Sequence, residues 1–164
     1  MHTLRDLLIH EIKDLYHAER QIVKALPKLA DAAESGELKE ALNNHLEETR
    51  QQVERLEQAM TKLDVAQRGT KCQAMEGLIA EGEELLKEAD DPAVRDAAII
   101  AACQRVEHYE MAGYGCAIAY ARQLGEEDVS SLLETTKEEE MAADDLLTNI
   151  AEQTVNPHAM TVTA

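Results

Sequence analysis

The amino-acid sequence predicts an all-α protein, built as a four-helix bundle, and three observations support this fold class. First, helix-forming residues such as Ala, Leu, Glu, Lys and Gln dominate, while Gly occurs only seven times and Pro three times. Second, apolar residues recur at helical spacing in four long segments. Third, the connections between these segments are alternately short and long, and no segment shows the alternation that is typical of a strand.

The first helix is expected from about Thr3 to Glu34, and the second from about Glu37 to Leu63. Both carry aliphatic residues at helical spacing on one face. Glu19 lies in the apolar stripe of the first helix, which is formed by Leu4, Leu8, Ile12, Leu15, Ile22, Leu26 and Leu29. Ser35-Gly36 joins the two helices, and we expect Gly36 in the left-handed conformation that often ends a helix.

The second half of the chain predicts three more helices. A short helix is expected from about Ala74 to Ala89, and Asp90-Asp91-Pro92 then marks the start of another. That long helix should run from about Ala93 to Leu124. The last helix should run from about Glu126 to Thr154 and end before Asn156-Pro157.

The lengths of the connections predict the topology. Two or so residues join the first two long helices, and likewise the last two, so each pair forms an antiparallel hairpin. About 29 residues, including the short fifth helix, separate the hairpins, enough to travel the length of the bundle. Two hairpins with one long crossover are the ferritin-like arrangement, expected over residues 1–156 with a flexible tail at 157–164. An up-and-down bundle with a decorated loop is the alternative.

The composition also limits the partners. A net charge of −17 repels phosphate groups and anionic lipid, so we expect neither nucleic acid nor membrane as a partner. The chain shows neither a signal peptide nor an apolar stretch of transmembrane length. Three widely spaced cysteines form no metal-binding pattern. We therefore expect a cytoplasmic protein whose acidic surface attracts cations.

Each long helix places a carboxylate at a similar depth in the bundle. Counted from the turn of its hairpin, Glu19 lies within about one helical turn of Glu48, and Glu140 matches Glu107 and Glu110. A buried carboxylate is unfavourable unless it is paired, protonated or bound to a metal. The sequence thus predicts a polar site at the centre of the bundle.

This site has the composition of a metal centre. His45 lies one turn before Glu48 on the same helix face, and the last helix offers Glu140 and Asp144. Carboxylate oxygens suit Fe and Mn, so the expected ligands of one or two such ions are Glu19, His45, Glu48, Glu107, Glu110, Glu140 and Asp144. The order His45-x-x-Glu48 reverses the Glu-x-x-His motif of di-iron bundles, and the last helix has no histidine.

Structural interpretations of the same residues remain open. Glu19 could pair with a Lys or Arg, His45 could be a neutral core histidine, and Glu48 could be half-exposed. Glu107 and Glu110 could form a hydrogen-bond network with Tyr109. In that case the protein would be a non-enzymatic helical scaffold or binding module.

Four motifs resemble the YciE/YciF family of bacterial stress proteins, and together they cover nearly the whole chain. They are Leu26-Pro27-Lys28-Leu29-Ala30, His45-Leu46-Glu47-Glu48-Thr49, Ala74-Met75-Glu76-Gly77-Leu78-Ile79, and Val106-Glu107-His108-Tyr109-Glu110 followed by Tyr114-Gly115. The resemblance implies a ferritin-like bundle, a cytoplasmic location, a homodimer and a link to stress responses. It implies no specific reaction. Our hypothesis is a stress-associated metal protein that acts on oxygen or peroxide.

Overall fold

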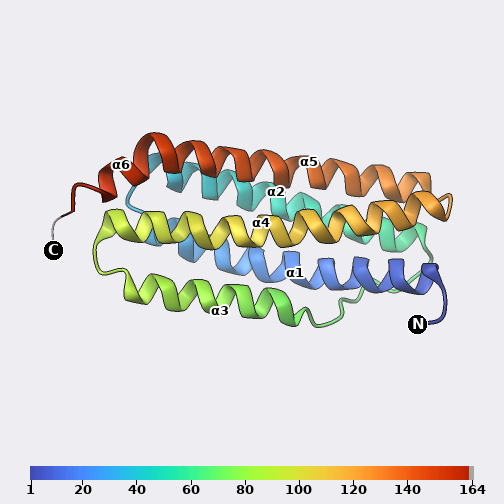
Figure 1. Cartoon of the computed structure of the whole chain (residues 1–164). Helices are drawn as coiled ribbons and strands as arrows, with labels where there is room; N and C mark the ends of the chain where they lie inside the picture. The colour runs from blue at the N-terminus through green and yellow to red at the C-terminus, as the bar shows by residue number, and fades with distance from the viewer. Residues whose placement is uncertain (163–164) are drawn as a thin grey trace.

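The computed structural model describes residues 1–162, which form an elongated bundle of long helices with a shorter helix along its side (Figure 1). Residues 163–164, the end of the expected tail, lie outside the described part of the chain. The helices of the described part are α1 (Leu4–Ala32), α2 (Gly36–Lys62), α3 (Gln73–Glu88), α4 (Pro92–Gln123), α5 (Glu127–Ile150) and α6 (Asn156–Ala159), with a π-helical turn at Ala151–Val155.

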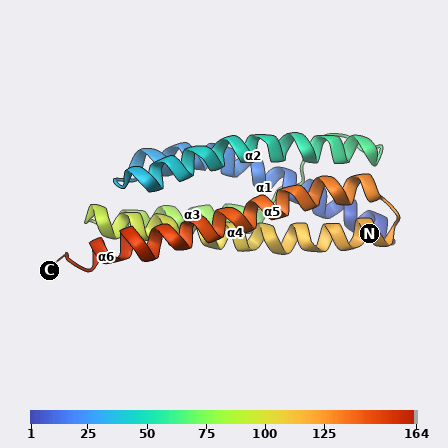
Figure 2. The ribbon, with the colours of Figure 1, turned by 90° about the horizontal axis from the view of Figure 1, so that it is seen from above.

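The bundle consists of two antiparallel hairpins, α1–α2 and α4–α5. Helix α1 packs against α4, α2 packs against α5, and α3 lies on the outside against α4 and α1. The crossover carries the chain back along the bundle, so α4 begins near the end of α1 and runs in the same direction as α2 (Figures 1 and 2). This is the expected ferritin-like topology, and it excludes the up-and-down alternative.

Side-chain caps fix where the helices begin. Thr3 and Asp6 form a reciprocal capping box at the start of α1. Asp91 accepts from the first backbone amides of α4, directly before Pro92. The expectation for Gly36 was wrong, because Ser35 caps α2 and Gly36 is its first helical residue. Among the described glycines, the left-handed conformation occurs at Gly125, with φ of 73°, between α4 and α5.

The last helix differs from its expected end before Asn156-Pro157. The backbone loosens into a π-helical turn from Ala151 to Val155, and the chain then continues as α6. Pro157 is tolerated because it lies in the first turn of α6, where its missing N–H is not required. Helical structure therefore extends to Ala159, into the segment that the sequence assigned to the tail.

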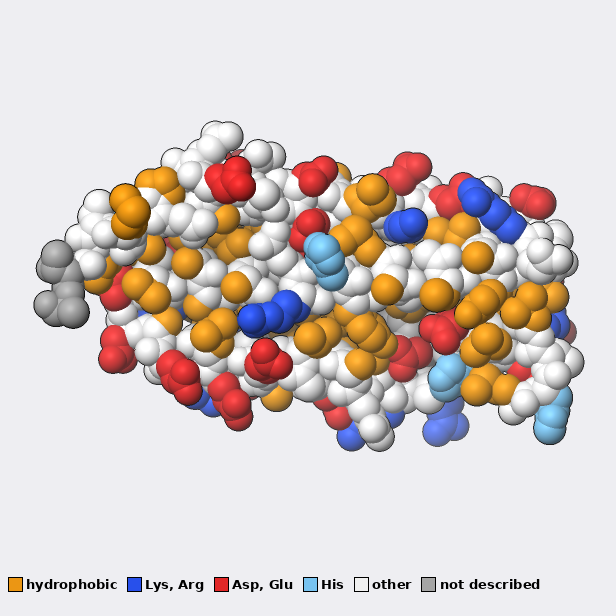
Figure 3. Space-filling view, viewed as in Figure 1, with side chains coloured by type: hydrophobic (Ala, Val, Ile, Leu, Met, Phe, Trp, Pro, Cys, Tyr) orange, Lys and Arg blue, Asp and Glu red, His pale blue; other side chains and the backbone are white. Residues whose placement is uncertain are grey.

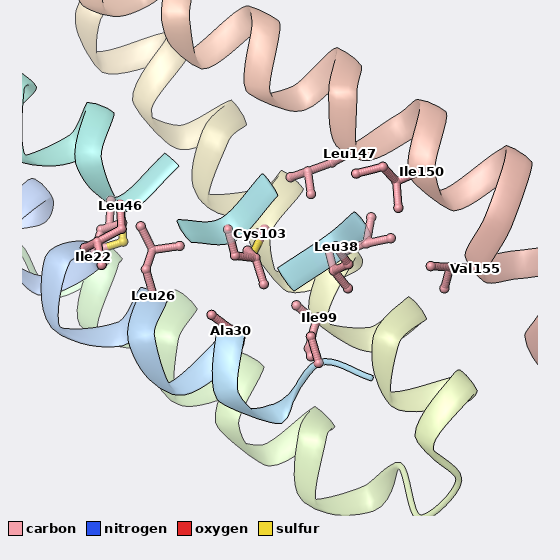
Figure 4. Close-up of a cluster of buried hydrophobic side chains, with 14 of the residues drawn as sticks. Ile22, Leu26, Ala30, Leu38, Leu46, Ile99, Cys103, Leu147, Ile150 and Val155 are labelled. Atoms are coloured by element: carbon pink, nitrogen blue, oxygen red, sulfur yellow. The ribbon is translucent and has the colours of Figure 1, made fainter. Parts of the chain in front are cut away.

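The core is divided along the bundle axis. One apolar cluster fills the end that holds the α1–α2 turn (Figure 4), and a second fills the opposite end. Every long helix passes from one cluster to the other: α1 contributes Leu8, Ile12 and Leu15 to one and Ile22 and Leu26 to the other. Between the clusters lies a set of buried polar side chains, here called the polar layer: Glu19, His45, Thr49, Gln52, Glu107, Glu110, Thr136 and Glu140.

The surface reflects the composition. Acidic side chains gather over α3 and along the outer edge of α5, and apolar side chains form a band between them (Figure 3). None of the helices within residues 1–162 has the length and hydropathy that a membrane span requires.

Candidate metal centre

All four helices of the bundle contribute to the polar layer, but the depth count expected a carboxylate from each, and α2 contributes His45 in place of Glu48. Glu19 (α1), Glu107 and Glu110 (α4) and Glu140 (α5) are at most 1 % exposed, and His45 (α2) is 7 % exposed. On each helix the polar residue falls in the apolar face, where helical spacing directs it to the bundle axis. Five titratable groups therefore share one buried layer.

His45, Glu107 and Glu140 form the tightest group in this layer. His45 Nε2 lies 3.2 Å from Glu107 Oε1 and 3.8 Å from Glu140 Oε2. One potential ligand atom from each of the three residues lies within 4.8 Å of the other two. Three helices thus converge on a point that a metal ion can occupy.

Burial and mutual repulsion perturb three of the carboxyl groups. Burial raises the pKa of Glu19 to about 7, although the hydrogen bond from the Tyr114 hydroxyl acts in the opposite direction and lowers it. Burial, together with the charges of neighbouring carboxylates, also raises the pKa values of Glu110 and Glu140 well above the ordinary range. The layer therefore retains protons that a bound cation would displace.

His45 and Glu107 behave as an ion pair. Burial alone would lower the pKa of His45, but the charge and proximity of Glu107 outweigh burial and raise it. Burial alone would raise the pKa of Glu107, but the positive charge of His45 outweighs it and lowers that pKa. The imidazolium supplies one positive charge, shared between Glu107 at 3.2 Å and Glu140 at 3.8 Å, against four buried carboxyl groups.

The hydrogen-bonding state of the layer fits a metal centre. The buried atoms without a hydrogen-bond partner among the described residues are Glu19 Oε2, both ring nitrogens of His45, Gln52 Oε1, Glu107 Oε2, both carboxyl oxygens of Glu110 and of Glu140, and Asp144 Oδ1. Buried polar atoms are rarely left unpaired in folded proteins. Nine of these ten atoms belong to residues that the sequence predicted as ligands, and carboxylate oxygen and imidazole nitrogen are the donors that Fe and Mn prefer.

Glu48 and Asp144 lie at the edge of the layer. The side chain of Glu48 is 47 % exposed, and its Oε2 lies 3.6 Å from His45 Nδ1. Asp144 lies beside His108, with 3.2 Å between Asp144 Oδ2 and His108 Nε2. The structure thus gathers five of the seven predicted ligands at the centre and places these two on the solvent side.

Tyr114 is a member of the site that the spacing argument missed. It is fully buried, and its hydroxyl donates a hydrogen bond to Glu19 Oε1. Tyr114 follows Glu110 by four residues and Glu107 by seven, so helical spacing alone places all three on one face of α4. That periodicity was the signal that could have revealed it.

A neighbouring ion pair closes the layer toward the second apolar cluster. Nη1 and Nη2 of Arg55 each donate to one carboxyl oxygen of Glu139 at 2.6 Å. Thr136 accepts a further hydrogen bond from Arg55, and Gln52 donates one to Glu139. Arg55 therefore forms its ion pair with Glu139. Glu19, which the sequence left open to pairing with a Lys or Arg, instead accepts a hydrogen bond from Tyr114.

Residues 3–160 match a family described as a domain of unknown function, DUF892. The chain belongs to this family. It is 45 % identical over 160 residues to Protein YciF of Escherichia coli K12, covering 97 % of this chain and 96 % of that protein. The resemblance found in the motifs is thereby confirmed.

Solved structures support the fold of this DUF892 member. The E. coli stress protein YciF matches with a TM-score of 0.90 and 45 % identity, covering 95 % of this chain and 99 % of that one. YcfI of Rhodopseudomonas palustris matches with a TM-score of 0.89 and 47 % identity, covering 91 % and 95 %. A Xanthomonas campestris protein with 22 % identity and a TM-score of 0.75, covering 96 % and 97 %, shares the fold.

Proposed function

We propose that the polar layer binds one or two Fe or Mn ions. His45, Glu107 and Glu140 form the core of the ligand set, and Glu19 and Glu110 provide further carboxylates for a second ion or for bridging. Glu48 and Asp144 are the outer ligands of the proposal, on the solvent side of His45 and beside His108 respectively. The observation that carries the proposal is the convergence of His45, Glu107 and Glu140 at a buried point.

The energetics of the layer support this proposal. Four carboxyl groups and one imidazole at one level of an apolar bundle are unfavourable without compensation. The His45–Glu107 pair compensates part of the charge, and protonation of the remaining acids compensates part of the rest. A divalent cation would compensate both the charge and the unpaired oxygens.

We further propose that the protein acts on dioxygen or peroxide under stress, in line with the name of its E. coli relative. A bound Fe or Mn ion supplies redox and Lewis-acid chemistry. The residues of this chain hold the centre in place: Tyr114 orients Glu19, and the two apolar clusters exclude water from both ends.

Metal titration of matched variants tests the proposal. Apo protein titrated anaerobically with Fe²⁺ or Mn²⁺ should bind one or two ions per chain. Glu140→Gln should weaken the binding at least tenfold, because it removes a buried ligand oxygen. Glu54→Gln is the matched control on the exposed face of α2, and it should bind as the unchanged protein does. Absence of binding after anaerobic loading would refute the proposal.

A structural role for the buried acids is the second candidate, and the hydrogen bond from Tyr114 to Glu19 favours it. In that case the bundle is a scaffold or binding module, and Glu19→Gln changes stability without any change in metal affinity. The metal proposal instead predicts that Glu140→Gln weakens the binding of the metal ion at least tenfold. The two candidates therefore give different results in the same titration.

We also propose a cytoplasmic homodimer. Met141 and Leu146 on α5 are 49 % and 46 % exposed, and a second copy that covered them would remove this apolar surface from water. Light scattering of the purified protein tests this: a dimer mass supports the proposal, and Met141→Lys should shift it to the monomer. A monomer mass at high concentration would refute it.

A further inference from the structure

A cavity of about 420 Å³ lies between α2, α4 and α5 and is here called the acidic cavity. Its buried end is formed by His45 and Glu107, two members of the tightest group in the polar layer. At its outer end the side chain of Glu48 is 47 % exposed, and Asn44 and Glu138 are exposed as well. Because a water molecule in the liquid takes up about 30 Å³, the cavity has room for an ion with several waters. The cavity therefore reaches from the surface to the polar layer.

The lining of the acidic cavity carries a negative charge. Its charged and titratable members are Glu48, Glu107, Glu138, Glu139 and His45, with neither a lysine nor an arginine among them. Arg55 lies nearby and forms its ion pair with Glu139, and Lys137 extends toward Gly115 of α4, outside the lining. Neither Glu48 nor Glu138 lies within ion-pair distance of a lysine or arginine in residues 1–162. The carboxylates at the mouth thus attract cations.

Small side chains keep the acidic cavity open. Helices α2 and α5 pack against each other, and the lining between them includes Ala41 of α2 and the consecutive Ala142 and Ala143 of α5. Ala143 is half-buried, so a larger side chain at this position would project into the cavity. The width of the cavity therefore depends on residues that bind nothing themselves.

His45 lies between the mouth of the acidic cavity and the buried centre. Its Nδ1 lies 3.6 Å from Glu48 Oε2 on the solvent side, and its Nε2 lies 3.2 Å from Glu107 Oε1 on the buried side. Both ring nitrogens lack a hydrogen-bond partner among the described residues, although the side chain is only 7 % exposed. The order His45-x-x-Glu48 places the carboxylate outside the imidazole on one face of α2. An ion that first binds Glu48 would therefore meet the buried ligands next.

A second cavity, of about 320 Å³ between α1, α3 and α4, is the alternative route to the centre. Cys103 and Glu107 line both cavities, so the two reach the same turn of α4 from different sides. The walls of the second cavity are mainly aliphatic, and it is here called the apolar cavity. Transfer of an ion between apolar walls is unfavourable, whereas the acidic cavity supplies oxygen ligands along its length.

We propose that divalent cations reach the polar layer through the acidic cavity, and that Glu138 and Glu48 capture the hydrated ion at its mouth. This inference rests on the proposed function, because the polar layer is the destination of the ion. It adds a route, and it adds Glu138, which is not a ligand of the bound ion. A carboxylate at the mouth of a cleft accelerates the association of a cation by raising its local concentration.

Stopped-flow absorbance of the anaerobic, metal-free protein mixed with Co²⁺ tests the capture step. Co²⁺ is coloured and takes the same nitrogen and oxygen ligands as Fe²⁺ and Mn²⁺. Glu138→Lys should slow the association about tenfold at low salt and about twofold at about 0.5 M NaCl, which screens the charges. The number of ions bound at saturation should stay the same.

Glu84→Lys is the matched control for the capture step. Glu84 is exposed on α3, away from α2 and α5, and its replacement changes the net charge by the same amount. This variant should bind Co²⁺ at the rate of the unchanged protein to within about twofold. Equal slowing by the two variants, or no slowing by Glu138→Lys, would overturn the proposal.

Two cavity-filling variants test the route itself. Ala143 lines the acidic cavity and Ala25 lines the apolar cavity, and both residues are half-buried. Ala143→Phe should slow both the association and the release of Co²⁺ about tenfold, because the ion must then wait for the helices to move apart. Ala25→Phe should leave both rates unchanged. The opposite pattern, in variants that circular dichroism shows to be folded, would overturn the proposal.

Equilibrium binding separates this inference from the proposed function. If the unchanged protein binds no Co²⁺, Fe²⁺ or Mn²⁺, both are overturned. If it binds these ions and the variants load at unchanged rates, only the route is overturned. The rates are compared at one protein concentration, at which light scattering gives the same mass for each variant, because Leu146 lines the acidic cavity and also lies on the face proposed for the homodimer.

Discussion

The hydroxyl of Tyr114 on α4 donates a hydrogen bond to the carboxylate of Glu19 on α1, and both side chains are fully buried. The bond joins the two hairpins at the level of the polar layer. It is the one hydrogen bond that the carboxylate of Glu19 makes to the described side chains, and its other oxygen is unpaired. This contact therefore links the stability of the bundle to the protonation state of the buried carboxyl groups in the polar layer.

Replacement of Tyr114 by Phe should destabilise the protein by about 1–3 kcal/mol, because it leaves a buried carboxyl oxygen without a donor. Urea unfolding measures the change. Tyr16→Phe is the matched control: it removes a hydrogen bond to Glu57, which is only half-buried, and should cost less than about 1 kcal/mol. Equal losses in the two variants would contradict a special role for the Tyr114–Glu19 bond.

The stability of the metal-free protein should fall as the pH rises from about 5 to 8. Burial raises the pKa of Glu19 from 4.5 to about 7, so the folded state holds a proton that the unfolded state releases. Stability is then greatest below pH 4.5 for this group and is lost through pH 7, by roughly 3 kcal/mol for Glu19 alone. Glu110 and Glu140 act in the same direction. Urea unfolding at pH 5 and pH 8 with a chelator measures the slope.

Two controls separate this effect from the repulsion of the acidic surface. Glu110→Gln should flatten the slope and raise the stability at pH 8 by about 1 kcal/mol, since it removes a buried acid that must otherwise ionise. Saturating Mn²⁺ should also flatten the slope, because the cation displaces the retained protons. A slope that is unchanged by both would show that the surface charge alone determines it.

Gly113 permits close packing of α4 on α1. A Cβ built there would lie 2.9 Å from Leu15 Cδ2, and Leu15 is 1 % exposed within the second apolar cluster. Gly113→Ala should therefore lower the stability by about 1 kcal/mol despite the better helix propensity of Ala. Gly77→Ala on α3 is the control: nothing lies within 4 Å of its Cβ, so it should gain about 0.5–1 kcal/mol. Thermal unfolding that shows equal changes would contradict the packing argument.

Asp96 holds the turn between α1 and α2. Its two carboxyl oxygens accept from the backbone amides of Glu34 and Ser35 at 2.9 and 2.8 Å, and the side chain is 4 % exposed. Asp96→Ala should cost about 2–3 kcal/mol, since it leaves two amides of the turn without this acceptor. Asp31→Ala on the exposed face of α1 should change the stability by less than about 0.5 kcal/mol. Denaturant unfolding that ranks the two alike would be evidence against this role.

The sequence predicted the helices closely because their signals are local. Apolar spacing and the cap at Asp91 depend on residues within a few positions of one another. The end of α5 was misjudged for the same reason. Asn156-Pro157, judged from neighbouring residues alone, predicts the end of the helix. In the structure the backbone instead forms a π-helical turn, and Pro157 lies in the first turn of a further short helix.

By itself, the sequence determined the fold class, the ferritin-like order of the hairpins and the presence of a polar layer with a titratable residue from each of the four helices, since periodicity and connection length require nothing beyond the chain. Only the tertiary structure decided which side chains meet. It brought His45, Glu107 and Glu140 together and left Glu48 and Asp144 at the edge of the polar layer. It also showed that Tyr114 is the hydrogen-bond donor to Glu19. Depth along an axis can be counted from a sequence, but the rotation of each helix and the partner of each buried oxygen are set by packing between helices.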